Sequence, residues 1–235
     1  MRKKYTLLLV DADDTVLDFK RCEHDALRNV LLQFGFPASD GIIAIYSEIN
    51  DRMWKLLEKK EITKPDLRVR RFRDFLEQMH YPADAVQVAD AYEAALSREH
   101  HLLPGAGEAA QKLSGKIPMY IITNGLEPVQ KYRLAESGIN GWFDGVFISG
   151  KIGAEKPSAA FFAAVERELG GLDRAHTLVI GDSLTSDIAG AVNAGLDSLW
   201  ISRGKKAPAE PKYTYMLSEF AEVPAFLGLD EEKSE

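Results

Sequence analysis

Three aspartates stand within four residues near the N-terminus, directly after an apolar run. Residues 7–10 read LLLV, and Asp11, Asp13 and Asp14 follow. Neighbouring carboxylates repel one another and resist leaving water, so a buried group of them requires a positive charge in its midst. Mg²⁺ meets that requirement, because it takes one or two carboxylates, keeps several waters and adds phosphate oxygens.

Polar residues also follow three later apolar runs. Ligands bind beyond the C-terminal ends of the strands in a parallel α/β sheet, so we expect these residues to meet Asp11 and Asp13 at one edge of the sheet. Lys156 would supply a second positive charge, and the site could then transfer a phosphoryl group to an aspartate. The polar residues are Thr123, Asn124 and Gly125 after the second run, Lys156 after the third, and Asp182, Ser183 and Asp187 after the fourth.

Five short apolar runs predict the strands that would position these residues. Segments with helical spacing lie between the later runs, and a glycine falls where each of these helices should end. Helices that alternate with buried strands are typical of a parallel sheet covered on both faces, so the predicted fold class is α/β with a Rossmann-like core. The predicted strands are 5–10, 117–123, 145–149, 176–182 and 197–202, and the helices are 127–138, 158–171 and 186–195.

Residues 17–100 interrupt this alternation. Four amphipathic patterns, at 22–35, 45–60, 64–80 and 83–100, predict helices there. A crossover of this length is too long for a simple link between two parallel strands. The chain is therefore predicted to have a core domain, 1–16 with 101–235, and an inserted α-helical cap domain, 17–100.

The composition narrows the possible partners. The net charge of −7 argues against a nucleic-acid polymer, and no apolar run approaches the ~18 residues of a membrane span. Cys22 is the only cysteine, which excludes an internal disulfide and a thiolate metal cluster. The apolar stretch after the basic start is too short for a signal peptide, so a cytoplasmic location is expected. Monomer and homodimer both stay open.

The four polar segments resemble the four motifs of the haloacid dehalogenase (HAD) superfamily. The resemblance spans about residues 5 to 202, and the insertion after the first motif resembles the superfamily's first class of helical cap, C1. Asp14 departs from the pattern, since many members have glycine there, and we expect it to face solvent. The motifs are Asp11-x-Asp13-x-Thr15, Thr123-Asn124-Gly125, Lys156-Pro157 and Gly181-Asp182-Ser183-x-x-x-Asp187.

The resemblance implies a role for each motif residue. Asp11 would be the nucleophile that forms an aspartyl-phosphate, and Asp13 the general acid and then the base. The expected cofactor, Mg²⁺, would be bound by the Asp11 carboxylate, the Asp13 backbone carbonyl and Asp182. The remaining roles are phosphoryl binding by Thr123 and Lys156, substrate binding by Asn124 and Gly125, and support of Lys156 or the metal by Ser183 and Asp187.

Residues 11–19, 49–72 and 181–202 resemble more closely the pyrimidine 5′-nucleotidase branch of the superfamily. This finer resemblance implies that Asn50, Trp54 and Arg71 of the cap contact the substrate. The predicted function is a Mg²⁺-dependent phosphatase of small phosphorylated metabolites, most of all pyrimidine nucleoside 5′-monophosphates. Asp13 favours this over dehalogenation, because a halide needs no proton when it leaves. The alternatives are a phosphatase of phosphoglycolate or a sugar phosphate, a phosphomutase, and a catalytically silent binding module.

Several of these residues also have simpler explanations. Lys156 before Pro157 could begin a helix with proline in its first position, and Asp187 could charge a helix N-terminus. Trp54 could belong to the cap core. Residues 55–73 hold eight Lys or Arg against three acids, which fits either a solvated helix face or a basic lid that attracts an anion. No two histidines have metal-ligand spacing on a helix.

Overall fold

The computed structural model describes residues 4–210 and 212–229. Its centre is a six-stranded sheet in the order β3-β2-β1-β4-β5-β6, in which every neighbouring pair is parallel. The predicted α/β fold is confirmed, and each predicted run contains a strand. β6 was not predicted, because three residues are too few for a periodic pattern. The strands are β1 Leu7–Val10, β2 Met119–Thr123, β3 Gly145–Ile148, β4 Thr177–Gly181, β5 Asp197–Ile201 and β6 Tyr215–Leu217.

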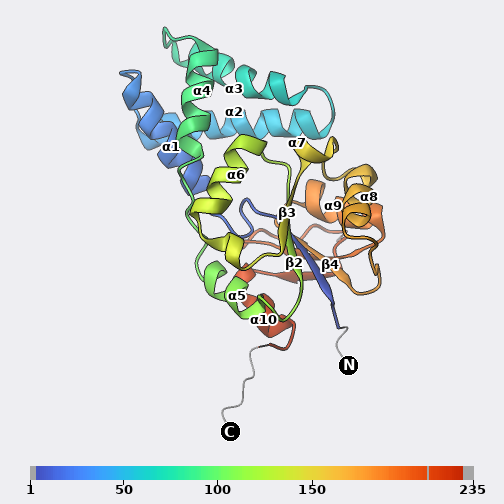
Figure 1. Cartoon of the computed structure of the whole chain (residues 1–235). Helices are drawn as coiled ribbons and strands as arrows, with labels where there is room; N and C mark the ends of the chain where they lie inside the picture. The colour runs from blue at the N-terminus through green and yellow to red at the C-terminus, as the bar shows by residue number, and fades with distance from the viewer. Residues whose placement is uncertain (1–3, 211, 230–235) are drawn as a thin grey trace.

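Helices cover both faces of the sheet (Figure 1). Successive side chains of a strand point to opposite faces, so Leu8 and Val10 of β1 join one apolar cluster and Leu9 joins another. The first cluster includes α5 and α10, and the second includes α8 and α9. These and the other core helices are α5 Ala106–Leu113, α6 Glu127–Glu136, η1 Ile139–Gly141, α7 Ser149–Ile152, α8 Ala159–Glu168, η2 Leu184–Ile188, α9 Ala189–Ala194, η3 Phe220–Glu222 and α10 Val223–Phe226.

The insertion folds as four helices that stand together at one end of the molecule (Figure 1). They enclose an apolar cluster of their own, at whose centre the rings of Tyr46, Phe72 and Tyr92 lie with centroids 5.0–5.5 Å apart. No helix in the described part of the chain is both long and apolar enough to span a bilayer. The four helices are α1 Phe19–Gln33, α2 Asp40–Glu58, α3 Lys64–Met79 and α4 Ala85–Leu96.

Polar side chains fix where these helices begin. Thr63 and Asp66 form a capping box at the start of α3, and Asp84 accepts two backbone N–H groups at the start of α4. Asp18 accepts the N–H of Arg21 at the start of α1. α1 and α2 begin earlier than the apolar spacing predicted, because their first turns carry few of the buried residues that define the pattern.

The two connections between the four helices and the sheet lie side by side. Leu17 pairs with Leu102, the N–H of Asp18 donates to the carbonyl of His101 at 2.8 Å, and the N–H of Leu103 donates to that of Val16 at 2.9 Å. The chain therefore leaves and re-enters the core at one hydrogen-bonded place.

Candidate active site

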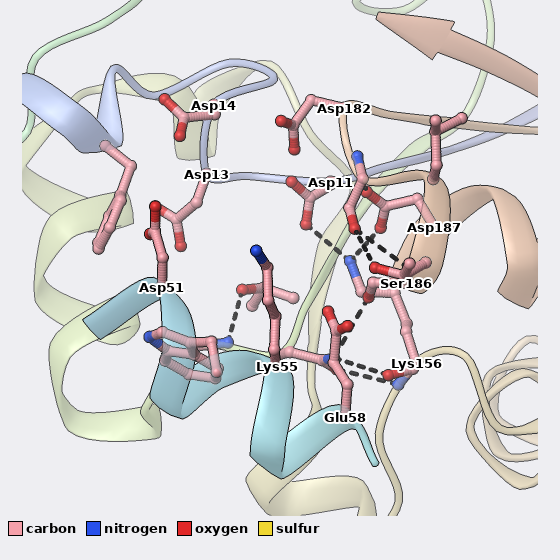
Figure 2. Close-up of a pocket in the computed structure, with 18 of the residues that line it drawn as sticks. Asp11, Asp13, Asp14, Asp51, Lys55, Glu58, Lys156, Asp182, Ser186 and Asp187 are labelled. Carbon is pink, nitrogen blue, oxygen red and sulfur yellow. Dashed lines mark hydrogen bonds and ion pairs between the residues drawn. The ribbon is translucent and has the colours of Figure 1, made fainter. Parts of the chain in front are cut away.

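A cavity of about 440 Å³ lies between the C-terminal ends of the strands and the cap helices α1 and α2. The residues that follow β1, β2 and β4 line it from the sheet side (Figure 2). The structure brings together all nine core residues that the sequence singled out. They are Asp11, Asp13, Thr123, Asn124, Gly125, Lys156, Asp182, Ser183 and Asp187.

Lys156 lies at the centre of the charged residues. Its buried ammonium donates to Asp11 Oδ1 at 2.6 Å, to Asp187 Oδ1 at 2.7 Å and to the carbonyl of Ile122 at 2.7 Å. An ammonium has three N–H donors, so all three are used. The simpler explanation, a helix start with Pro157 in the first position, does not apply, because α8 begins at Ala159.

Burial and repulsion shift the proton affinities of this group. Burial would lower the pKa of the Lys156 ammonium, but the carboxylates of Asp11 and Asp187 raise it above its ordinary value. Burial, with repulsion from Asp187, raises the pKa of Asp11 despite the opposing effect of Lys156. The same two causes raise the pKa of Asp182 to about 6, although Lys205 opposes them. Burial is the main cause of the raised pKa of both aspartates, and repulsion between the carboxylates adds to it, so a further positive charge would favour their ionised forms.

Three carboxylates are arranged so that they could bind a cation. One oxygen each from Asp11, Asp182 and Asp187 lies within 4.8 Å of the other two. Oxygen ligands suit a hard cation such as Mg²⁺, and the raised pKa values indicate that added positive charge would be favourable. Lys205 donates to Asp182 Oδ2 at 2.9 Å and partly supplies that charge.

The hydroxyl of Thr123 is oriented as a donor. It accepts the N–H of Gly125 at 3.0 Å and the side-chain N–H of Gln130 at 2.8 Å. A hydroxyl has two acceptor positions and one proton, so the proton is left to donate elsewhere. A Cβ on Gly125 would lie 2.6 Å from the Gln130 side chain, which explains the glycine.

Asn124 and Ser183 hold the surrounding loops. The Asn124 amide accepts the N–H of Lys156 at 2.9 Å and donates to its carbonyl at 2.8 Å. The N–H of Ser183 donates to Asp187 Oδ2 at 3.1 Å, and the Ser183 hydroxyl caps the turn of η2. Gly181 leaves room for Asp187, since a Cβ there would lie 2.3 Å from the Asp187 carboxyl group.

Sequence reasoning missed Gln130 and Arg133 of α6, which contact Asp13. Gln130 Nε2 donates to Asp13 Oδ2 at 2.7 Å, and Arg133 donates to Asp13 Oδ1 at 2.6 Å. Both side chains are about 1% exposed. Their only signal in the sequence is that two long polar side chains lie at positions i and i+3 of the predicted helix 127–138, each next to an apolar residue, Val129 or Leu134.

The three predicted cap residues lie in different places. Trp54 lines the cavity, as do Asp51, Lys55 and Glu58 of the same helix. Asn50 and Arg71 lie instead inside the cap. Arg71 donates to Asn50 Oδ1 at 3.0 Å, and Asn50 donates to buried Glu23 at 2.7 Å. In this structure, the predicted substrate contact of Asn50 and Arg71 is therefore wrong, because both side chains are buried and the Asn50 amide bridges Arg71 and the buried glutamate.

The basic stretch of residues 55–73 has no single role. Lys55 faces the cavity, and Lys64 joins cap to core by donating to the Asn124 carbonyl at 2.9 Å and to Ser149 Oγ at 2.7 Å. Arg68 forms ion pairs with acids of α4. This stretch is thus neither a uniformly solvated face nor a continuous basic lid.

The expectation for Asp14 is also wrong. Its side chain is only 16% exposed and forms an ion pair with Arg203. Burial raises the pKa of Asp14, against the lowering effect of Arg203. Its backbone has a φ of 60°, in the left-handed region that glycine adopts most readily.

Replacement of Lys156 by Met should destabilise the protein as well as the site. The carboxylates of Asp11 and Asp187 would be left buried without their shared counter-charge, so the free energy of unfolding should fall by about 3–5 kcal/mol. Urea denaturation in the presence of a chelator measures this. The double variant Lys156→Met, Asp187→Asn should recover part of the loss, and a single variant as stable as the parent would contradict the prediction.

The chain is similar to known proteins in both sequence and structure. Residues 5–195 match the family of haloacid dehalogenase-like hydrolases. The HAD-hydrolase YfnB of Bacillus subtilis is 34% identical over 97% of each chain. Its solved structure, described as bound to magnesium and as revealing interdomain movement, has a TM-score of 0.90 over 96% of this chain and 99% of that one.

Two further relatives are named pyrimidine 5′-nucleotidases. PynA of Streptococcus pneumoniae is 36% identical over 83% of each chain, and YjjG of Escherichia coli is 27% identical over 95% of this chain and 98% of its own. The predicted superfamily and fold are thereby confirmed, and these relatives agree with the predicted enzyme class, a phosphoric monoester hydrolase. The chain belongs to the haloacid dehalogenase-like hydrolases.

Proposed function

We propose that this hydrolase is a Mg²⁺-dependent phosphatase of nucleoside 5′-monophosphates, pyrimidine ones above all. The observation that carries the proposal is the Lys156 ammonium, which donates to both Asp11 and Asp187 with Asp182 beside them. This arrangement offers a nucleophilic carboxylate, a fixed cation and a place for a second cation around one phosphoryl group. The relatives named pyrimidine 5′-nucleotidases support the choice of substrate.

In the first step, Asp11 attacks the phosphorus atom. Its carboxylate is oriented by Lys156 at 2.6 Å and by the hydroxyl of Thr15 at 3.3 Å. The new bond from carboxylate oxygen to phosphorus forms as the ester P–O bond breaks, which gives an aspartyl-phosphate. Asp13 gives its proton to the leaving oxygen, so the nucleoside departs as a neutral alcohol.

In the second step, water attacks the phosphorus of the aspartyl-phosphate while the Asp13 carboxylate takes a proton from it. The bond from phosphorus to Asp11 breaks, inorganic phosphate forms, and both side chains return to their starting state. The Thr123 hydroxyl donates a hydrogen bond to a phosphoryl oxygen. The Lys156 ammonium, whose three N–H groups are used by Asp11, Asp187 and Ile122, stabilises the negative charge that develops there through its positive charge.

The aspartates of the site also offer the ligands for Mg²⁺. Asp11, Asp182 and the backbone carbonyl of Asp13 would hold Mg²⁺, with Asp187 and Ser183 supporting them. The bound ion would neutralise charge on the carboxylates and the phosphoryl oxygens. The description of the YfnB structure as bound to magnesium supports this assignment.

The cap side of the cavity supports a nucleotide as substrate. Trp54 supplies an aromatic surface on which a base can stack, and Lys20 and Lys55 supply positive charge. Figure 2 shows the Lys55 ammonium extending from α2 toward the aspartates of the core. The cap, residues 17–100, would close over the substrate, exclude bulk water during attack and open to release the products. Asn124 and Gly125 would line the phosphate end.

Replacement of Asp11 by Asn should abolish hydrolysis of p-nitrophenyl phosphate, with a loss of at least about a thousand-fold, because an amide cannot act as the nucleophile. Steady-state rates and a circular dichroism melt would measure activity and folding. Asp90→Asn, on the exposed surface of α4, is the matched control and should keep the parent rate. An active, folded Asp11→Asn variant would remove Asp11 from its role.

A chelator should stop hydrolysis, and added Mg²⁺ should restore it, since the buried carboxylates need a cation before a dianionic substrate can enter. In a titration of rate against Mg²⁺, Asp182→Asn should require at least about ten-fold more of the ion. Full activity in the chelator would rule out the metal-dependent site.

A panel of phosphate esters would test the substrate. Pyrimidine nucleoside monophosphates should give higher kcat/KM than purine ones, phosphoglycolate or sugar phosphates. Trp54→Ala should lower kcat/KM for the nucleotides by about 5- to 150-fold, the range for loss of one base stack. It should leave phosphoglycolate unaffected, and Trp142→Phe, away from the cavity, serves as the control. Equal losses on all esters would argue against stacking on Trp54.

A further inference from the structure

We propose that Gln130 and Arg133 are positioning residues that hold the Asp13 carboxylate in place for proton transfer. This inference rests on the proposed function, in which Asp13 is the acid and base. Neither residue belongs to the four motifs, and both lie on α6, a helix that otherwise packs against the core and cap. Hydrogen bonds join both residues to Asp13, and Gln130 also to Thr123.

Each oxygen of Asp13 accepts one hydrogen bond from α6. Oδ2 accepts from Gln130 Nε2 at 2.7 Å, and Oδ1 accepts from Arg133 at 2.6 Å. Two donors on different oxygens fix both the position and the rotation of the carboxylate. Because a carboxylate oxygen has about two acceptor sites, each oxygen keeps one site for a substrate proton or a water.

Arg133 also sets the direction of the Gln130 amide. The same Arg133 nitrogen donates to Gln130 Oε1 at 3.0 Å, so this end of the amide is the acceptor and the NH₂ end must face Asp13. That NH₂ group donates to Thr123 Oγ1 at 2.8 Å as well. One oriented amide therefore holds the proposed acid and leaves the proposed phosphate-binding hydroxyl as a donor.

Arg133 is in turn fixed to both connections between cap and core. Its Nε donates to the carbonyl of Glu99 at 3.0 Å, and its guanidinium lies 5.6 Å from the ring centroid of Phe19. Glu99 lies on the connection that returns to the core, and Phe19 begins the first cap helix. The position of Asp13 is thus tied to the segments that would bend when the cap moves.

A packing role alone does not account for these two side chains. The Arg133 side chain is about 1% exposed, and it forms an ion pair with Asp13, whose side chain lines the cavity and is 26% exposed. Burial of a guanidinium is costly without a partner charge. An apolar side chain would fill the same space without that cost, so the structure retains the charge where it contacts the proposed acid.

The test is a double-mutant cycle on the full chain, with melting temperature as the check on folding. The probe is uridine 5′-monophosphate, because its leaving oxygen needs a proton, whereas p-nitrophenolate would leave without one. Gln130→Leu and Arg133→Lys should each lower kcat by about ten-fold or more and change KM by less than about three-fold, since proton transfer is typically worth about 10²–10⁴. In an Asp13→Asn background, each should cost less than about three-fold, because the group through which they act is gone.

Arg71→Lys is the matched control, since Arg71 is nearly as buried as Arg133, and neither Arg71 nor its hydrogen-bond partner Asn50 lines the cavity. It should keep kcat within about three-fold. Losses for Gln130→Leu and Arg133→Lys that are equally large in the Asp13→Asn background would overturn the inference. If Asp13→Asn is inactive while both variants keep the parent kcat, only this inference falls. If Asp13→Asn keeps the parent rate, the acid–base role in the proposed function falls with it.

Discussion

One buried ammonium shared by two buried carboxylates is the contact on which the site depends. Lys156 lies 2.6 Å from Asp11 and 2.7 Å from Asp187, and Lys205 pairs with Asp182, so two positive charges face three carboxylates. The remaining negative charge is unfavourable in a buried site, as the raised pKa of Asp182, about 6, indicates. This imbalance explains both the attraction for a cation and the need for a fold rigid enough to hold mutually repelling groups together.

The fold opposes that repulsion by joining the loops to one another directly. The Asn124 amide binds both backbone groups of Lys156, so the loop after β2 holds the residue that follows β3. Gly181 ends β4 without a Cβ, and the vacant space is filled by the Asp187 carboxyl group. Parallel strands bring the loops to one edge, and these contacts then fix the charged atoms at hydrogen-bonding distance.

The sequence was sufficient for β1 to β5 and for the polar residues that follow them, because both signals are local: an apolar run, then a polar residue. Gln130 and Arg133 could not be found this way, since polar residues on an amphipathic helix usually face solvent and only the tertiary structure shows that these are buried. The prediction for Asn50 and Arg71 was wrong because the sequence does not show their burial either. They were expected to contact the substrate, whereas they hydrogen-bond within the cap around a buried glutamate.

The geometry of α2 explains why that error is easy to make. Asp51, Trp54, Lys55 and Glu58 follow helical spacing and face the cavity, whereas Asn50 lies only one residue, or about 100°, away and faces the cap core. The part of the cap that lines the cavity is therefore largely one stripe of α2, with Phe19 and Lys20 of α1 beside it. The groups proposed to carry the chemistry lie on the strand ends and on α6. Substitutions on the stripe can thus change which ester is bound without moving the atoms that would break it.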